Sequence, residues 1–209
     1  MSTFLTVRMF VTVAFAVAAF IFFKKKFKVM EYLFTVTIFF ALSAFVPAEN
    51  IFKFATPGAA LQYQTTRHAT DVINSEKFSV VLYKKNERAV GVFQTGKSGN
   101  KYTLPMLFND TGKMLDMPYD YPGLTAYICR AGGSDKAILV IIEYDALTEG
   151  DRYSYTDTQN SLFKQLDKRL LTKDDETIVS IHYAEIDAND KNYSLSIDNK
   201  VVFRDLKIK

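Results

Sequence analysis

The sequence predicts two N-terminal transmembrane helices followed by a mostly antiparallel β domain of the α+β class. Residues 4–47 are almost entirely apolar, and the lysines that interrupt this stretch all lie within 24–28. After Glu49, short runs of β-branched and aromatic residues alternate with turn-forming residues. We therefore divide the chain into a membrane anchor, 1–48, and a β-rich domain, 49–209.

The anchor holds two apolar segments that we expect to be helices. A membrane span needs roughly 20 apolar residues to cross about 30 Å of hydrocarbon. Residues 3–23 meet this length, and Arg8 lies near enough to one end to extend toward the interface. Residues 29–47 form a slightly shorter segment, which carries Glu31 at its edge and ends at Pro47.

The lysine-rich loop 24–28 predicts how the anchor is oriented. Short loops rich in lysine stay on the cytoplasmic side, so both termini would face outward. We expect a multi-pass protein of the cell membrane, in contact with lipid, whose C-terminal domain is extracytoplasmic. A rival interpretation is a signal peptide cleaved near Ala48, which would release the domain. Either way the domain is exported.

Charge and cysteine content exclude two classes of function. The first 48 residues carry five cations and one acid, a net charge of +4, whereas the whole chain carries +3, so the remainder is near −1. A near-neutral domain lacks the basic surface of a nucleic-acid binder. The single cysteine, Cys129, permits neither an intramolecular disulfide nor a Cys/His zinc pattern.

The first half of the domain predicts one helix and several strands. Thr56 and Pro57 resemble an N-cap and a first helical residue, which places a short helix at 58–63. The remaining patterns predict a hairpin of residues 78–83 and 89–95, with 84–87 as its turn, and a strand at 102–108.

The second half predicts further strand pairs. Residues 124–130 and 137–144 form one pair, and 137–142 is apolar enough to be covered on both faces. Residues 177–186 alternate cleanly, and 193–197 with 201–203 form a closing hairpin. In 161–171 the apolar residues are spaced as in an amphipathic helix, with a strand from Ser161 as the alternative.

Residues 91–98 match the phosphate-binding pattern G-x-x-x-x-G-K-[ST] letter for letter. In a true P-loop, Ser98 would open a helix whose N-terminus faces the phosphates. Here 91–95 is typical of a strand and 99–105 cannot start a helix. Nucleotide binding therefore stays a minor alternative, and we expect no cofactor.

No metal or catalytic site stands out. Residues 187–192 suggest a calcium loop but lack its glycine and its final glutamate, so a polar turn is the simpler interpretation. Asp174–Glu176 is also best interpreted as a solvated turn. His68 and His182 lie far apart in sequence, although His182 shares a strand face with Ser180. We assign no catalytic residue, but an envelope hydrolase assembled from one histidine and a serine remains an alternative.

Tyrosines beside acids are the candidate binding residues. Exposed tyrosine next to aspartate on loops can bind sugars or protein partners, whereas strand-edge tyrosines packing over a small sheet would give the same pattern. The candidates are Tyr119, Tyr121, Tyr144 and Tyr153.

The chain resembles a loose group of uncharacterised, membrane-anchored exported proteins from Gram-positive bacteria. The segments that carry this resemblance are 56–63, 78–83, 182–185 and 193–197. The resemblance implies the anchor-plus-domain topology and no activity. From all these observations we expect a non-enzymatic domain that binds or senses an envelope ligand or a protein partner.

Overall fold

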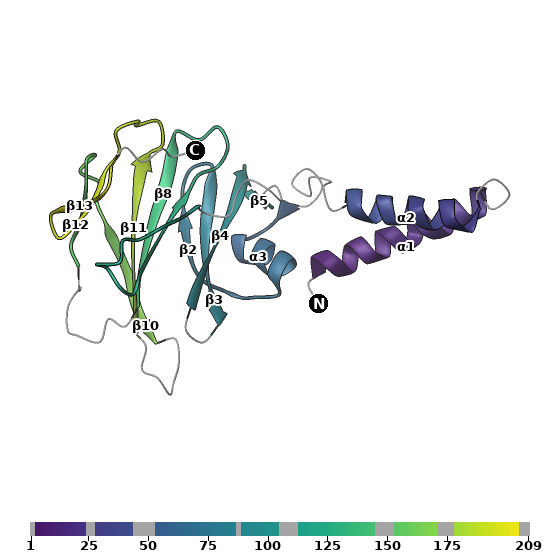
Figure 1. Ribbon diagram of the computed structural model, residues 1–209, viewed down its shortest axis with the longest axis horizontal. Coiled ribbons are helices and arrows are strands. Elements are labelled where there is room, and N and C mark those ends of the chain that lie inside the picture. The colour runs from purple at the N-terminus through teal and green to yellow at the C-terminus, as the bar shows by residue number, and fades with distance from the viewer. Residues whose placement is uncertain are drawn as a thin grey trace.

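The computed structural model describes residues 3–23, 28–43, 53–86, 89–104, 113–144, 153–170 and 178–204. Two helices, α1 (Thr3–Phe23) and α2 (Val29–Ser43), form a hairpin beside a body of antiparallel sheets (Figure 1). The rings of Phe15 and Phe39 stack between the two helices, with centroids 3.8 Å apart. The hydroxyl of Tyr32 donates a hydrogen bond of 2.5 Å to the carbonyl of Ala16.

The predicted membrane anchor is wrong. Across the parts of the chain that the structure describes, none of the helices has both the length and the apolar character that crossing a bilayer demands. With 15 residues, α2 is about 22 Å long, less than the roughly 30 Å of hydrocarbon. Residues 44–47 of the second expected span lie outside the described residues. The multi-pass location in the cell membrane, with the C-terminal domain displayed outside by two spans, is therefore wrong. Residues 24–27 of the expected cytoplasmic loop 24–28 lie outside the described residues.

The short helix α3 (Pro57–Thr65) confirms the capping prediction. The side chain of Thr56 accepts a hydrogen bond from the N–H of Ala59, and Pro57 occupies the first helical turn. Thr66 closes the helix in the left-handed conformation. The buried side of α3 packs in a small hydrophobic cluster made by Ala60, Leu61, Val81, Phe93 and Leu104.

Sheet A contains the predicted hairpin 78–95. Its strands lie in the order β1, β5, β4, β3, β2, all antiparallel. Their bounds are β1 (Lys53–Phe54), β2 (Ala69–Asn74), β3 (Phe78–Asn86), β4 (Ala89–Ser98) and β5 (Lys101–Thr103). Of the strand expected at 102–108, β5 contains only residues 102 and 103; Leu104 is not in a strand, and residues 105–108 lie outside the described part.

Sheet B lies in the middle of the body, with strand order β10, β11, β8, β7, β6. Its strands are β6 (Lys113–Leu115), β7 (Leu124–Cys129), β8 (Lys136–Tyr144), β10 (Lys164–Leu170) and β11 (Ile178–Asp187). The expected pair of 124–130 with 137–144 and the strand 177–186 are confirmed. The amphipathic helix expected at 161–171 is wrong, because β10 pairs with β11 instead.

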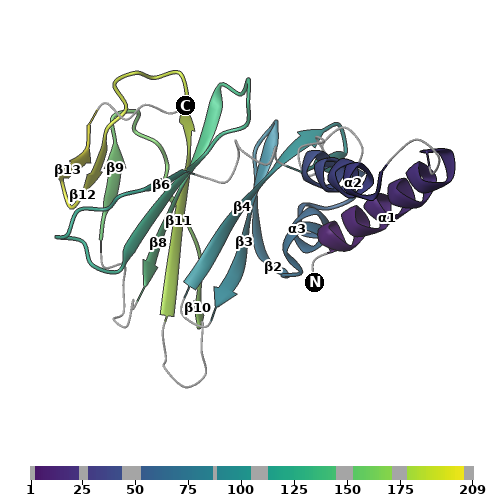
Figure 2. The ribbon, with the colours of Figure 1, turned by 45° about the vertical axis from the view of Figure 1, so that its right-hand side comes forward.

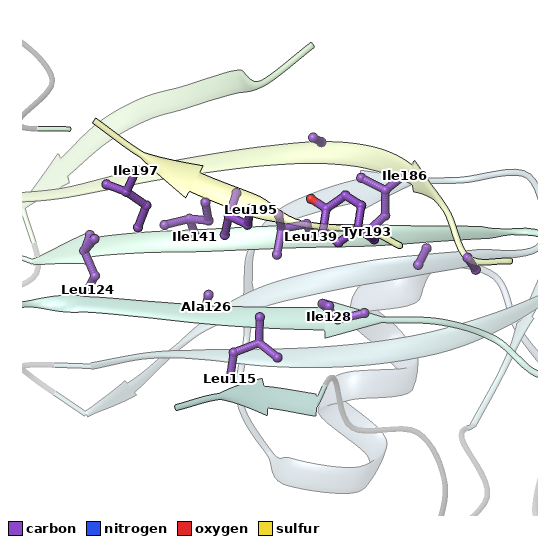
Figure 3. Packing of buried hydrophobic residues seen from close by; sticks show 13 residues of the cluster. Leu115, Leu124, Ala126, Ile128, Leu139, Ile141, Ile186, Tyr193, Leu195 and Ile197 are labelled. Carbon is purple, nitrogen blue, oxygen red and sulfur yellow. The ribbon is translucent and has the colours of Figure 1, made fainter. Parts of the chain in front are cut away.

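Sheet C is small and consists of β13 (Lys200–Phe203), β12 (Leu195–Ile197) and β9 (Tyr155–Asp157). It covers one face of sheet B, and sheet A covers the other (Figure 2). As predicted, β8 is buried on both faces. Figure 3 shows the core between sheets B and C, in which Leu139 and Ile141 of β8 meet Tyr193, Leu195 and Ile197.

Candidate functional site

Two of the four predicted binding tyrosines meet where the loop 116–123 approaches sheet C. The rings of Tyr121 and Tyr153 lie edge to face, with centroids 5.7 Å apart and planes at 68°. This is a preferred geometry for aromatic pairs. Both rings are partly buried against the core between sheets B and C. The hydroxyl of Tyr121 donates a hydrogen bond of 3.4 Å to the carbonyl of Ile197, which fixes the pair to the end of β12.

Tyr119 stands out from the same loop into solvent, with 99% of its surface exposed. The N–H of Tyr121 donates a 3.1 Å hydrogen bond to the carbonyl of Pro118, which closes a turn around Tyr119. Pro118 and Pro122 flank this turn and restrict the backbone on either side. The exposed ring is therefore carried by a constrained turn.

The β12–β13 turn supplies polar groups beside the tyrosine pair. One carboxylate oxygen of Asp198 accepts hydrogen bonds from the N–H and the hydroxyl of Ser154, at 2.8 and 3.1 Å. The N–H of Asp198 donates to the carbonyl of Ser154 at 3.0 Å. Asp198 and Asn199 have φ values of 51° and 63°, as the two central residues of a type I′ hairpin turn do. We call Tyr119, Tyr121, Tyr153, Ser154 and Asp198 the tyrosine–aspartate surface.

Tyr144 does not join this surface. It ends β8 on the face toward sheet A and packs with the core between sheets A and B. Its hydroxyl accepts a hydrogen bond of 3.2 Å from the N–H of Val90. Burial raises the pKa of Tyr144, and the hydrogen bond from Val90 lowers it by less. Sheet B thus separates Tyr144 from the other three predicted tyrosines.

A second candidate site is a buried polar cluster between sheets B and C. Ser180 of β11 lies directly opposite Glu143 of β8 in the strand register. His182 follows two residues later, on the same face of β11. The exposed fractions are 1% for Glu143, 0% for Ser180 and 5% for His182. Buried polar groups of this kind are stable only when they are hydrogen-bonded.

Hydrogen bonds connect this cluster. The hydroxyl oxygen of Ser180 lies 3.0 Å from Nε2 of His182 and accepts a 2.8 Å hydrogen bond from the side-chain amide of Gln165. Because Gln165 donates to it, Ser180 can donate its own hydrogen to an unprotonated Nε2. The tautomer of His182 decides the direction of this bond: Ser180 donates to an unprotonated Nε2 and accepts from a protonated one.

Tyr155 closes the cluster from sheet C. Its hydroxyl donates a 3.4 Å hydrogen bond to a carboxylate oxygen of Glu143. Its ring lies 4.8 Å from the ring of His182 and 6.0 Å from that of Phe163. Tyr155 is two residues from Tyr153, so one short segment contributes to both candidate sites. A serine hydroxyl beside an imidazole is the pairing used in nucleophilic catalysis, but here the hydroxyl is buried.

The strand pattern had indicated only that His182 and Ser180 share a face. It missed Glu143, Tyr155 and Gln165, and missed Ser154 and Asp198 at the other site. One signal was present: Glu143 is the single acid within the most apolar strand, 136–144. His68 lies elsewhere, exposed and just before β2, so the two histidines are not brought together.

The phosphate-binding match lies in extended backbone. Residues 91–96 belong to β4 and pair with β3, and Ser98 ends the strand before the turn at Gly99. A Cβ placed on Gly91 would lie 2.3 Å from the ring of Tyr83, so this glycine permits close packing within the sheet. Where a P-loop requires a helix after Lys97, this chain has the last residue of β4 and then a turn at Gly99 and Asn100.

The calcium-like segment 187–192 is a polar turn, as we expected. One oxygen of Asp187 accepts from the N–H of Asn189 at 2.8 Å, and one oxygen of Asp190 accepts from the N–H of Asn192 at 2.9 Å. These are Asx turns. Within the residues that the structure describes, no group of three or more potential metal ligands gathers. Asp174–Glu176 lies outside them.

No family model matches the chain, and neither the curated proteins nor the solved structures include one similar to it. The resemblance to membrane-anchored proteins of Gram-positive bacteria therefore stays a prediction. The assignment of function rests on the geometry of the two candidate sites, of which the tyrosine–aspartate surface is the one open to solvent.

Proposed function

We propose that the β-rich part of the chain is a binding module whose ligand or protein partner contacts the tyrosine–aspartate surface. The observation that supports this proposal is the position of Tyr119, 99% exposed beside the fixed pair of Tyr121 and Tyr153. Tyrosine is enriched at recognition surfaces because its ring offers a large contact area and its hydroxyl a hydrogen bond.

The surface is held in place before any ligand arrives. The Tyr121 hydroxyl is bonded to Ile197, and the backbones of Ser154 and Asp198 are bonded to each other. Binding to a preorganised surface loses less conformational entropy than binding to a mobile one. This favours recognition by the rigid part of the domain.

Arrays that carry both oligosaccharides and peptides test the proposal. Full-length protein should bind a subset of spots, and Tyr119→Ala should lose those spots. The control is Tyr102→Ala, which removes a half-buried tyrosine from β5 of sheet A and should leave binding unchanged. Equal binding by wild type and Tyr119→Ala would reject this surface.

Hydrolysis is a second candidate function, and one observation favours it. Ser180 and His182 lie 3.0 Å apart in the geometry by which an imidazole removes a hydroxyl proton. Because Ser180 is 0% exposed, a substrate could reach it only after the side chains that cover this buried cluster moved away. Because it requires this movement, we rank hydrolysis as a less well supported function than ligand binding.

A fluorophosphonate probe separates the two candidates, because it forms a covalent adduct with serines activated by a base. An adduct on wild type that disappears in Ser180→Ala would support hydrolysis. The matched control is Ser196→Ala, a serine of β12 in the adjacent sheet, which should not change labelling. A wild-type protein that forms no adduct would remove the hydrolase candidate.

A further inference from the structure

We infer that the ligand of the tyrosine–aspartate surface is a neutral saccharide chain, with one sugar ring stacked on Tyr119. The inference rests on the proposed binding function and adds the chemical class of the ligand. Three features carry it: the presentation of one ring, the mixture of polar groups beside it, and the distribution of apolar surface.

A single exposed ring on a rigid turn suits a sugar. The face of an aromatic ring carries negative charge and attracts the slightly positive C–H groups of a pyranose face. Tyr119 is almost completely exposed, whereas one face or edge of Tyr121 and Tyr153 is used in their own contact. Tyr119 is thus the ring that a ligand can cover.

The neighbouring polar groups both donate and accept hydrogen bonds. Asp120, Asp198 and Asn199 are exposed on the same loop and turn, and the Ser154 hydroxyl, which donates to Asp198, can still accept a hydrogen bond. Carboxylates accept only, while amide and hydroxyl groups do both. Sugar hydroxyls also do both, so this mixture complements them. Asp116, Asp120 and Asp198 outnumber the exposed Lys200 that follows the turn, which disfavours an anionic ligand.

A protein partner fits this surface less well. Stable protein interfaces bury about 800 Å² on each partner around an apolar centre. In the described part of the β-rich body, the exposed large hydrophobic residues are few and come from different elements. They are Val72, Met114, Tyr119, Leu162 and Val201. One exposed ring with acidic residues in its own loop and on the β12–β13 turn is the smaller target that a sugar needs.

The absence of tryptophan from the chain allows a direct titration. Full-length Tyr119→Trp places one fluorophore on the surface and keeps an aromatic face. Addition of cellohexaose, chitohexaose and maltohexaose should give a saturable change in emission with at least one of them. The same change in Tyr102→Trp, on sheet A, should be absent.

Calorimetry on tyrosine variants then separates stacking from hydrogen bonding. Tyr119→Phe should bind the same oligosaccharide within about threefold of wild type, while Tyr119→Ala should bind it about tenfold more weakly. Urea unfolding of both variants checks that they remain folded.

Two results would overturn the inference. If none of the oligosaccharides binds but Tyr119-dependent peptides appear on the arrays, the saccharide class is wrong and the binding function stands. If neither ligand class depends on Tyr119, both fail.

Discussion

The hydroxyl of Tyr144 accepts a 3.2 Å hydrogen bond from the backbone N–H of Val90, which joins the end of β8 to the start of β4. The bond connects sheet B to sheet A at the edge of their shared core. It also explains why Tyr144, predicted as a binding residue, is unavailable to a ligand on the far side of sheet B.

Tyr144→Phe should lower the free energy of unfolding by about 1–2 kcal/mol, because the N–H of Val90 loses its partner in a partly buried place. Urea unfolding at pH 7 measures the change. Tyr119→Phe is the matched control, since an exposed hydroxyl should change stability by less than about 0.5 kcal/mol. Equal effects of the two substitutions would contradict the bridging role.

Gly91→Ala should destabilise the fold by about 1–3 kcal/mol, because its Cβ would lie 2.3 Å from Tyr83 and force the ring or the strand to move. Gly132→Ala has no atom within 4 Å of the added Cβ and is the control. Thermal or urea unfolding compares them. A neutral Gly91→Ala would mean that Tyr83 moves away without loss.

The thiol of Cys129 should be almost unreactive in the folded protein. Burial raises its pKa to about 12, so at pH 8 the thiolate fraction should fall by a factor on the order of 10³ from that of an ordinary thiol. Reaction with a chromogenic disulfide should be fast in 8 M urea and slow in buffer. Rapid labelling under native conditions would place the thiol at the surface.

Tyr193 should make the fold sensitive to alkali. Its pKa is raised by burial first and then by the carboxylate of Asp157. Because the folded state favours the neutral phenol, this contribution to stability is present below the unfolded pKa of about 10 and is lost as pH rises above it. Tyr193→Phe should therefore lose less stability than wild type between pH 9 and 11. If the free energy of unfolding fell equally with pH in the two proteins, this prediction would be wrong.

Sequence patterns correctly predicted the strands whose apolar and polar residues follow a single regular pattern from end to end. The apolar run 137–142 and the alternation in 177–186 each reflect one complete strand of sheet B. The segment 161–171 failed because β10 contains a bulge between Leu166 and Arg169. One additional residue there shifts the alternation, so the apolar spacing imitates a helix.

The candidate sites were harder to predict from local sequence patterns, because they depend on contacts between segments that are far apart in the chain. Tyr121 meets Tyr153 only because β9, three residues long, pairs with β12. Glu143 meets Tyr155 for the same reason. No periodicity within 153–157 indicates this third sheet. The two membrane spans were predicted from composition alone, and composition does not report where α2 ends.

The chain path through the three sheets has a consequence for how the protein folds. Strands β2 to β5 of sheet A follow one another and pair through neighbouring contacts, whereas sheets B and C interleave: β9 belongs to C, β10 and β11 to B, and β12 to C. Sheets B and C therefore share the same stretch of chain and one core. Apart from the β1–β5 pairing, contacts in sheet A are local, which favours its early formation, whereas the shared core of B and C favours their assembly as one cooperative unit.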